Sequence, residues 1–265
     1  MTRSDFSLTV LGTRGSMAAC RPDCLLFGGD TTCYMIQAGE ETVFLDGGSG
    51  IVSAPASYRK PPVILLSHLH LDHVMGLAMF PALINRDQKI FLYVPFCRDA
   101  AEAEQQMDRL FSPPFWPVKL KELEADVEIL PMPESMEIRE LHVDTIRGNH
   151  PNGCMVFRLR YQGKTIVCAT DYEYTEASFS ELTDFAKDAD LLLFDAQFLD
   201  EEYASRKGFG HSTPGKALEL MRNSGAKRLL LIHHAPQCTD KILLQREKSL
   251  PPFCAYARQG QVIQL

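Results

Sequence analysis

The stretch that decides the fold is V-I-L-L-S-H-L-H-L-D-H, residues Val63–His73. It follows two prolines and opens with a short apolar run, which predicts a strand buried on both faces. Four polar side chains then fall within six positions: His68, His70, Asp72 and His73. Side chains alternate along an extended chain, so His68, His70 and Asp72 point to one side. A helical turn after Asp72 would bring His73 back toward the same point.

Three imidazoles and a carboxylate at one point suit zinc, manganese or iron. The alternative is a solvated loop that is merely rich in histidine. Three of the eight histidines fall in these six residues, at the end of an apolar strand, where rigid scaffolds commonly carry chemistry. We therefore interpret the stretch as a metal site.

The composition is that of an ordinary soluble globular protein. The 265 residues are 45% hydrophobic and 23% charged. No run approaches the roughly 18 apolar residues of a membrane helix, and the first ten residues lack the apolar core of a signal peptide. These features predict a cytoplasmic protein that does not bind membranes. The net charge of −7 argues against a general role in gripping nucleic acid, without excluding it.

The eight cysteines have no repeated spacing of the kind found in disulfide frameworks. In a reducing cytosol most of them should be free, buried thiols. Cys20 and Cys24, followed by Cys33, could contribute to a small structural zinc site, although the C-x3-C spacing is loose.

The rest of the chain predicts one compact domain over residues 1–265, without linkers or repeats. Strands are expected at residues 6–11, 32–37, 41–45, 63–66, 89–94, 127–130, 138–146, 155–161, 164–169, 191–194 and 228–232. Helices are expected at 74–84, 99–110, 178–187 and 213–224. The helix and the proline-rich F-S-P-P-F-W-P-V at 111–118 form an insertion at about 99–118. We interpret 111–118 as a lid; the alternative is that it simply caps the core.

Further polar groups directly follow predicted strands or precede a helix, where active sites of open sheets collect. Asp46 ends a strand beside two glycines and serves either as a turn cap or to orient a ligand histidine. The others are His150, Asp171, His211, His233 and His234. Seven ligand-type groups result: His68, His70, Asp72, His73, His150, Asp171 and His233. That number exceeds the needs of one four-coordinate zinc and suits two metals that share a carboxylate. His142 and His234 are left unassigned.

The motif H-L-H-L-D-H resembles the H-x-H-x-D-H signature of the metallo-β-lactamase superfamily. The spacing of His150, Asp171 and His233 is similar to that of its remaining ligands. The pieces G-T-R-G-S, F-G-G-D-T-T-C and G-H-S-T most resemble its phosphodiesterase branch, which includes ribonuclease Z and cyclic-phosphate phosphodiesterases. The resemblance implies an α+β fold, a four-layer αββα sandwich with the site at one edge of the two sheets. It also implies a homodimer.

The resemblance further implies a role for each site residue. His68, His70 and His150 would hold one metal, and Asp72, His73 and His233 the other, with Asp171 bridging them. His211 of G-H-S-T matches the histidine that ribonuclease Z-like enzymes place near the scissile phosphate. The alternative for His211 is a helix-start histidine without catalytic use.

These roles predict a dinuclear metal hydrolase, a phosphodiesterase for a small or cyclic phosphate ester. Two metals lower the pKa of a shared water, and Asp72 orients that water or accepts its proton, which gives a hydroxide nucleophile. The metals neutralise the phosphate oxygens, and a protonated His211 donates to the leaving alkoxide or holds the phosphate. Zinc or manganese is favoured and iron is the alternative, since the same ligands accept all three.

Several rival functions use the same scaffold. A lactone or thioester hydrolase would not depend on His211. A ribonuclease Z-like RNA endonuclease would need a glycine- and proline-rich arm that the sequence lacks. Antibiotic-hydrolysing members of the superfamily need no histidine for a phosphate, so the presence of G-H-S-T argues against β-lactam cleavage. Diiron oxidoreductases of this fold typically carry Glu in place of the ligand histidine found here as His70. A binding protein without turnover is disfavoured by the intact set of ligand-type residues.

Overall fold

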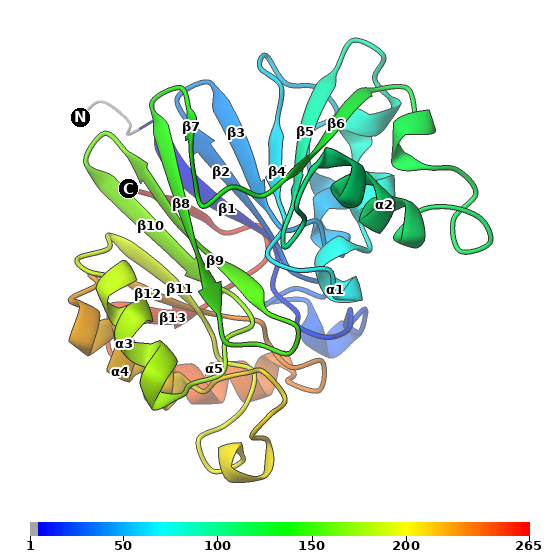
Figure 1. The fold of residues 1–265 in the computed structure, drawn as a ribbon. Coiled ribbons are helices and arrows are strands. Elements are labelled where there is room, and N and C mark those ends of the chain that lie inside the picture. The colour runs from blue at the N-terminus through cyan, green and yellow to red at the C-terminus, as the bar shows by residue number, and fades with distance from the viewer. Residues whose placement is uncertain (1–4) are drawn as a thin grey trace.

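The computed structural model describes residues 5–265, whose strands form two seven-stranded sheets with helices on their outer faces (Figure 1). The first sheet contains β1 (Phe6–Gly12), β2 (Cys33–Ala38), β3 (Glu41–Leu45), β4 (Val63–Leu65), β5 (Lys89–Val94), β6 (Asp126–Pro131) and β14 (Val262–Gln264). The second contains β7 (Ser135–Ile138), β8 (Leu141–Gly148), β9 (Cys154–Tyr161), β10 (Lys164–Ala169), β11 (Leu191–Asp195), β12 (Leu229–Ile232) and β13 (Cys254–Tyr256). The helices are α1 (Leu71–Val74), α2 (Ala100–Leu110), α3 (Glu176–Phe185), α4 (Pro214–Ser224) and α5 (Asp240–Glu247).

Each sheet has an antiparallel half and a parallel half. The first sheet runs in the order β14-β1-β2-β3-β4-β5-β6, with parallel pairing from β3 to β6. The second runs β13-β12-β11-β10-β9-β8-β7, with parallel pairing from β10 to β13. The expected hairpin of β2 and β3 is present, and Gly39 supplies the left-handed residue of its turn, with φ of 59°. Parallel strands carry their carboxyl ends at a common edge, which is where the polar residues cluster.

Three apolar cores separate the four layers. The cluster between the sheets joins Leu8 and Tyr34 of the first sheet to Leu159 and Leu193 of the second. A second cluster packs α2 on the outer face of the first sheet, and a third packs α3 and α4 on the outer face of the second (Figure 1). Full burial of each such side chain contributes about 1.5–3 kcal/mol. The αββα sandwich expected from the resemblance is confirmed.

One predicted element is wrong, and the start of another is displaced. The apolar spacing over 74–84 does not give one helix: α1 ends at Val74, and short 3₁₀ turns follow at Leu77–Met79 and Pro81–Ile84. Pro81 cannot donate a backbone hydrogen bond, so a continuous helix fails there. The strand expected at 138–146 is present as β8 but starts at Leu141, because the chain turns at Arg139, whose φ is 54°, and Ile138 ends β7. The short elements α5, β13 and β14 were not predicted.

The insertion at 99–118 contains α2 as expected, capped by the Asp99 carboxylate, which accepts a hydrogen bond from the Glu102 amide. In the proline-rich segment, Trp116 packs against the core beneath the first sheet, while the Phe115 side chain is 81% exposed. Trp116 therefore anchors the segment to the core. In residues 5–265 no helix is long and apolar enough to cross a membrane.

Candidate metal centre

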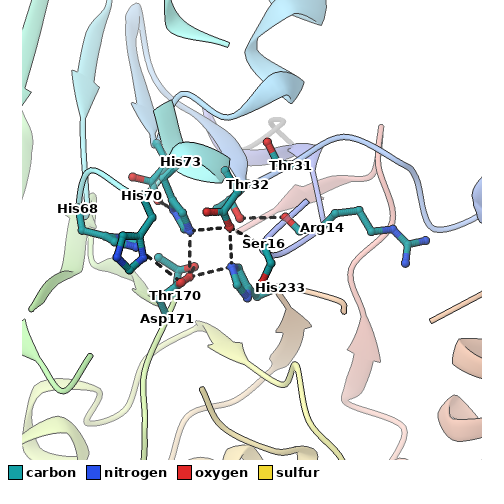
Figure 2. Close-up of polar contacts among 12 residues, drawn as sticks. Arg14, Ser16, Thr31, Thr32, His68, His70, His73, Thr170, Asp171 and His233 are labelled. Atoms are coloured by element: carbon teal, nitrogen blue, oxygen red, sulfur yellow. Dashed lines mark hydrogen bonds and ion pairs between the residues drawn. The ribbon is translucent and has the colours of Figure 1, made fainter. Parts of the chain in front are cut away.

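The structure brings all seven predicted ligand residues together at the strand ends. His68 and His70 lie between β4 and α1, and α1 itself carries Asp72 and His73. The second sheet supplies the other three: His150 follows β8, Asp171 follows β10 and His233 follows β12. Figure 2 shows the imidazoles of His68, His73 and His233 around Asp171, whereas the Arg14 side chain points away from this cluster.

The side chains fall into two groups of four that share Asp171. The first ligand group is His68, His70, His150 and Asp171; the second ligand group is Asp72, His73, Asp171 and His233. Within each group one ligand-type atom of every residue lies within 4.8 Å of the others. The two carboxylate oxygens of Asp171 face different groups: Oδ2 lies 3.7 Å from His68 Nε2, and Oδ1 lies 3.0 Å from His233 Nε2.

Unpartnered nitrogen atoms show that this cluster fits divalent metal ions. His68 Nε2 and His73 Nε2 are both buried and make no hydrogen bond. His73 Nε2 lies 3.1 Å from Asp171 Oδ1, but the two atoms are not aligned for one. Buried polar nitrogens without partners are costly in an apolar or desolvated site. Imidazole nitrogens converging with carboxylate oxygens are the donor set of zinc, manganese and iron.

The protonation states differ between the two groups. Burial lowers the pKa of His68 well below its ordinary value, and it also lowers the pKa of His70 and His150. These imidazoles are therefore neutral, as metal ligands must be. In the second group burial alone would lower the pKa of His233, but the Asp171 and Asp72 carboxylates outweigh it and raise the value to about 10. The His233 imidazole of the second ligand group is therefore protonated at neutral pH when metal is absent.

Asp171 is held as a carboxylate by its neighbours. Burial alone would raise its pKa, but the His233 and His73 imidazoles outweigh this effect and keep it well below the ordinary value. The same competition lowers the pKa of Asp72, where burial is opposed by His73 and His233. The Ser16 amide also donates to Asp72 Oδ2 at 2.7 Å, so the G-T-R-G-S loop reaches the site through its backbone.

Asp46 has the orienting role rather than that of a simple turn cap. Its Oδ2 lies 2.8 Å from His73 Nδ1, and its Oδ1 accepts a hydrogen bond from the Ser67 amide at 2.7 Å. This contact places the proton of His73 on Nδ1 and leaves Nε2 directed at the cluster. His150 is oriented in the same way, because its Nδ1 donates to the Gly210 carbonyl at 2.7 Å.

Three of these polar residues have left-handed backbone: Asp46, Asp171 and His233, with φ of 62°, 47° and 61°. Each comes at or just after the end of a strand, where this turn diverts the chain from the sheet. Left-handed backbone costs a non-glycine residue roughly 1–2 kcal/mol. Such strain persists where the surrounding structure fixes it, typically at functional sites.

Two glycines allow the close approach of backbone to ligand histidines. A Cβ atom at Gly15 would lie 2.1 Å from His233 Nδ1, and one at Gly210 would lie 2.2 Å from His150 Nδ1. Gly210 also has φ of +87°, which disfavours any side chain. The motifs G-T-R-G-S and G-F-G-H therefore fit directly against the cluster.

His211 lies at the edge of the cluster, stacked on His233 with ring centroids 4.8 Å apart. Its Nδ1 lies 2.7 Å from Asp195 Oδ2, which leaves Nε2 for another partner. Asp195 is fully buried and also accepts hydrogen bonds from the Tyr172 and Gln197 amides. A third close set of possible ligands consists of Asp171, Asp195, His211 and His233. In this set the Asp195 carboxylate already accepts hydrogen bonds from His211 and the two amides. Sequence reasoning missed Asp195, although it ends an apolar strand much as Asp171 follows one.

The two unassigned histidines lie outside the ligand groups. His142 on β8 contacts Glu137 and Asp144 near the surface. His234 is buried and donates from Nε2 to the Ala257 carbonyl at 2.8 Å, and burial lowers its pKa to about 3. Within residues 5–265 no cysteine joins a metal-binding group, so Cys20, Cys24 and Cys33 do not form the small zinc site considered above.

Comparison with known families identifies the superfamily of this chain. A family model described as the beta-lactamase superfamily domain matches residues 29–234, which is most of the chain. The chain therefore belongs to the beta-lactamase superfamily, and the resemblance to its metallo-β-lactamase members is confirmed.

Individual relatives point to the predicted branch. Ribonuclease Z of Gemmatimonas aurantiaca is 33% identical over 108 residues, 40% of this chain and 33% of that protein. Ribonuclease Z of Bradyrhizobium diazoefficiens is 22% identical over 93% of this chain and 95% of its own. Among solved structures, the metallo-β-lactamase fold protein YhfI from Bacillus subtilis superposes with a TM-score of 0.73 at 20% identity. That superposition covers 98% of this chain and 99% of YhfI, and it shows the shared fold.

Proposed function

We propose that this protein is a dinuclear metal-dependent phosphodiesterase that acts on a small or cyclic phosphate ester. The observation that carries the proposal is the pair of four-residue groups that share Asp171, with His211 beside them. Each ligand group combines imidazoles with the shared Asp171 carboxylate, and these imidazoles are either neutral or carry a proton that a metal can displace. Zinc and manganese are the metals proposed, with iron as the alternative.

Two bound divalent ions would supply the Lewis acidity that activates a water and neutralises charge on the phosphate. The residues of this chain have their own tasks. Asp72, whose Oδ2 is held by the Ser16 amide, is the carboxylate that would orient a water or accept its proton. His211 donates its Nδ1 proton in a hydrogen bond to Asp195, so Nε2 is the atom that would meet a phosphate oxygen or the leaving group.

Two alternatives remain distinct from this proposal. A lactone or thioester hydrolase would use the same ligand groups but would have no task for His211 and Asp195. An RNA endonuclease is suggested by the names of the ribonuclease Z relatives. The net charge of −7 and the lack of an RNA-gripping arm favour a small ester. The insertion at 99–118 would then limit access to the site, and a homodimer is the assembly we propose by family resemblance.

The test is hydrolysis of bis(p-nitrophenyl) phosphate by protein reloaded with zinc, manganese or iron, with metal content measured in every sample. We expect turnover well above buffer and a loss of at least about tenfold in His211→Ala, because a hydrogen bond to a charged phosphate is removed. His142→Ala is the matched control, since His142 lies outside the ligand groups, and it should retain full activity. Absence of turnover by fully metallated protein would contradict the proposal, and a lactone and a thioester assayed in parallel would then identify the alternative.

A further inference from the structure

We propose that a pocket beside His68 and His70 binds a heteroaromatic ring carried by the substrate, with Phe96 as its stacking surface. This inference rests on the proposed function, because it names the organic group attached to the phosphate. It assigns the substrate class to esters such as nucleotides, in which a flat ring with polar edges lies near the phosphate.

The pocket adjoins the first ligand group and has a volume of about 290 Å³. Its wall includes His68 and His70, whereas His211 and His233 are not part of it. The remaining wall is formed by Leu69, Pro95, Phe96, Gln106, Asn152 and Gly153. The volume is at the small end of ligand sites, which suits one ring-bearing group rather than a folded RNA. His211 would therefore meet a phosphate at the metal centre from outside this pocket.

Phe96 is the unusual residue of this wall. It has left-handed backbone, with φ of 59°, and its side chain is 42% exposed. Bulky residues rarely adopt this backbone, and an aromatic ring gains most from burial. Folding alone therefore gives no reason to hold an exposed phenylalanine in a strained conformation. Strain of this kind concentrates at ligand-binding positions, where it fixes a side chain in advance.

Arg147 braces the Phe96 ring at the pocket. Its guanidinium carbon lies 4.9 Å from the ring centroid, a cation–π contact. The same guanidinium passes close over Gly153, where a Cβ atom would lie 2.9 Å from Arg147 Nε. The Arg147 guanidinium also donates a hydrogen bond from Nη2 to the Asn152 carbonyl at 3.5 Å. The contact with Phe96 therefore helps to set the ring in place before any ligand arrives.

Two of the residues that line the pocket have amide side chains. Gln106 comes from α2 and is partly buried, and Asn152 comes from the turn that follows His150. An amide offers both a donor and an acceptor, which matches the ring nitrogens and exocyclic groups of a heterocycle. An aromatic face beside amide groups favours a heteroaromatic ring over an alkyl chain or a bare sugar, because base–aromatic stacking adds substantially to binding.

The test compares binding of adenosine 5′-monophosphate and ribose 5-phosphate to the metal-loaded protein by calorimetry. The two ligands share the phosphate and the sugar and differ in the ring. We expect the ring-bearing ligand to bind about tenfold more tightly. Phe96→Leu keeps the apolar bulk but removes the aromatic face, so this preference should disappear while metal content stays constant. Phe115→Leu is the control, because Phe115 is an exposed phenylalanine of the insertion at 99–118 and does not line the pocket. Equal binding of the two ligands, or a preference that survives in Phe96→Leu, would overturn the inference.

A second measurement separates this inference from the proposed function. Methyl p-nitrophenyl phosphate and thymidine 5′-(p-nitrophenyl phosphate) share the p-nitrophenyl leaving group, and only the second carries a heteroaromatic base, attached through its sugar. We expect a KM about tenfold lower for the thymidine ester, and loss of this difference in Phe96→Leu. Hydrolysis of both esters with equal KM would reject the ring pocket and leave the phosphodiesterase standing. Ring-dependent binding without hydrolysis of either ester would keep the pocket and reject the phosphodiesterase.

Discussion

Asp46 Oδ2 lies 2.8 Å from His73 Nδ1, and both side chains are fully buried. The contact fixes which nitrogen of His73 faces the second ligand group, although Asp46 itself is not among the seven ligand-type residues. A carboxylate behind a ligand imidazole also increases the basicity of that ligand.

Asp46→Asn should therefore weaken metal binding without removing a ligand. We expect the metal affinity of the second group, or the activity that depends on it, to fall by about 10- to 100-fold. Metal titration against a chelator measures the effect. Asp126→Asn, at an exposed carboxylate, serves as the control. Unchanged affinity in Asp46→Asn would mean that Asp46 only caps the turn.

Metal binding should release protons. His233 has a pKa of about 10 in the absence of metal, and the pKa of His73 is raised well above its ordinary value because Asp171 and Asp46 outweigh burial. Metal displaces these protons, so apparent affinity rises with pH until the histidines lose them unaided, by up to about tenfold per pH unit for each proton. Calorimetry in buffers of different ionisation enthalpy counts the protons. An affinity independent of pH between neutral and about pH 9 would contradict this assignment.

The Asp195–His211 pair should matter most when the leaving group is poor. If His211 donates a proton to the departing oxygen, His211→Ala should reduce kcat for an alkyl phosphodiester by about 10²- to 10⁴-fold, and for an aryl ester by less. Asp195→Asn should show the same dependence on leaving group in a weaker form, since the imidazole remains but loses its orienting carboxylate. Equal losses on both esters would assign His211 to phosphate binding alone.

A pair of glycine variants tests the close approach at His150. Gly208 and Gly210 both have φ of +87°, but only at Gly210 would a Cβ atom meet the His150 ring, while at Gly208 nothing lies within 4 Å. Gly208→Ala should cost about 1–2 kcal/mol of stability and keep the metal content. Gly210→Ala should carry the same strain and also displace His150, lowering the occupancy of the first ligand group. Thermal unfolding and metal analysis separate the two effects, and equal metal content in both variants would refute the clash.

Local signals in the sequence predicted which side chains converge at the sheet edge. His68, His70, Asp72 and His73 lie within six residues, so their convergence needs only a strand end and one helical turn. Asp171 and His233 were found because a polar residue that follows an apolar strand must emerge at the sheet edge. Asp195 has the same signal, but its pairing with His211 depends on the chain beyond β11 returning to that edge. This return has no local mark in the sequence.

The predicted elements failed where local and tertiary preferences differ. The spacing of Val74, Leu77 and Phe80 fits a helix, yet Gly76 and Pro81 break the segment into short turns that still bury all three apolar side chains. The β7–β8 turn is carried by Arg139, a residue that does not usually signal left-handed backbone. The three-residue strands β13 and β14 are held by pairing with β12 and β1, which no short sequence window reveals.

Each ligand group takes two side chains from before residue 74 and two from after residue 149. Neither half of the chain alone can therefore complete a four-ligand set. Retention of metal would report that the two halves have assembled with the correct register, which makes metal content a quality check on refolded or redesigned versions of this chain. It also means that fragments split between β6 and β7 should recover tight metal binding only when mixed.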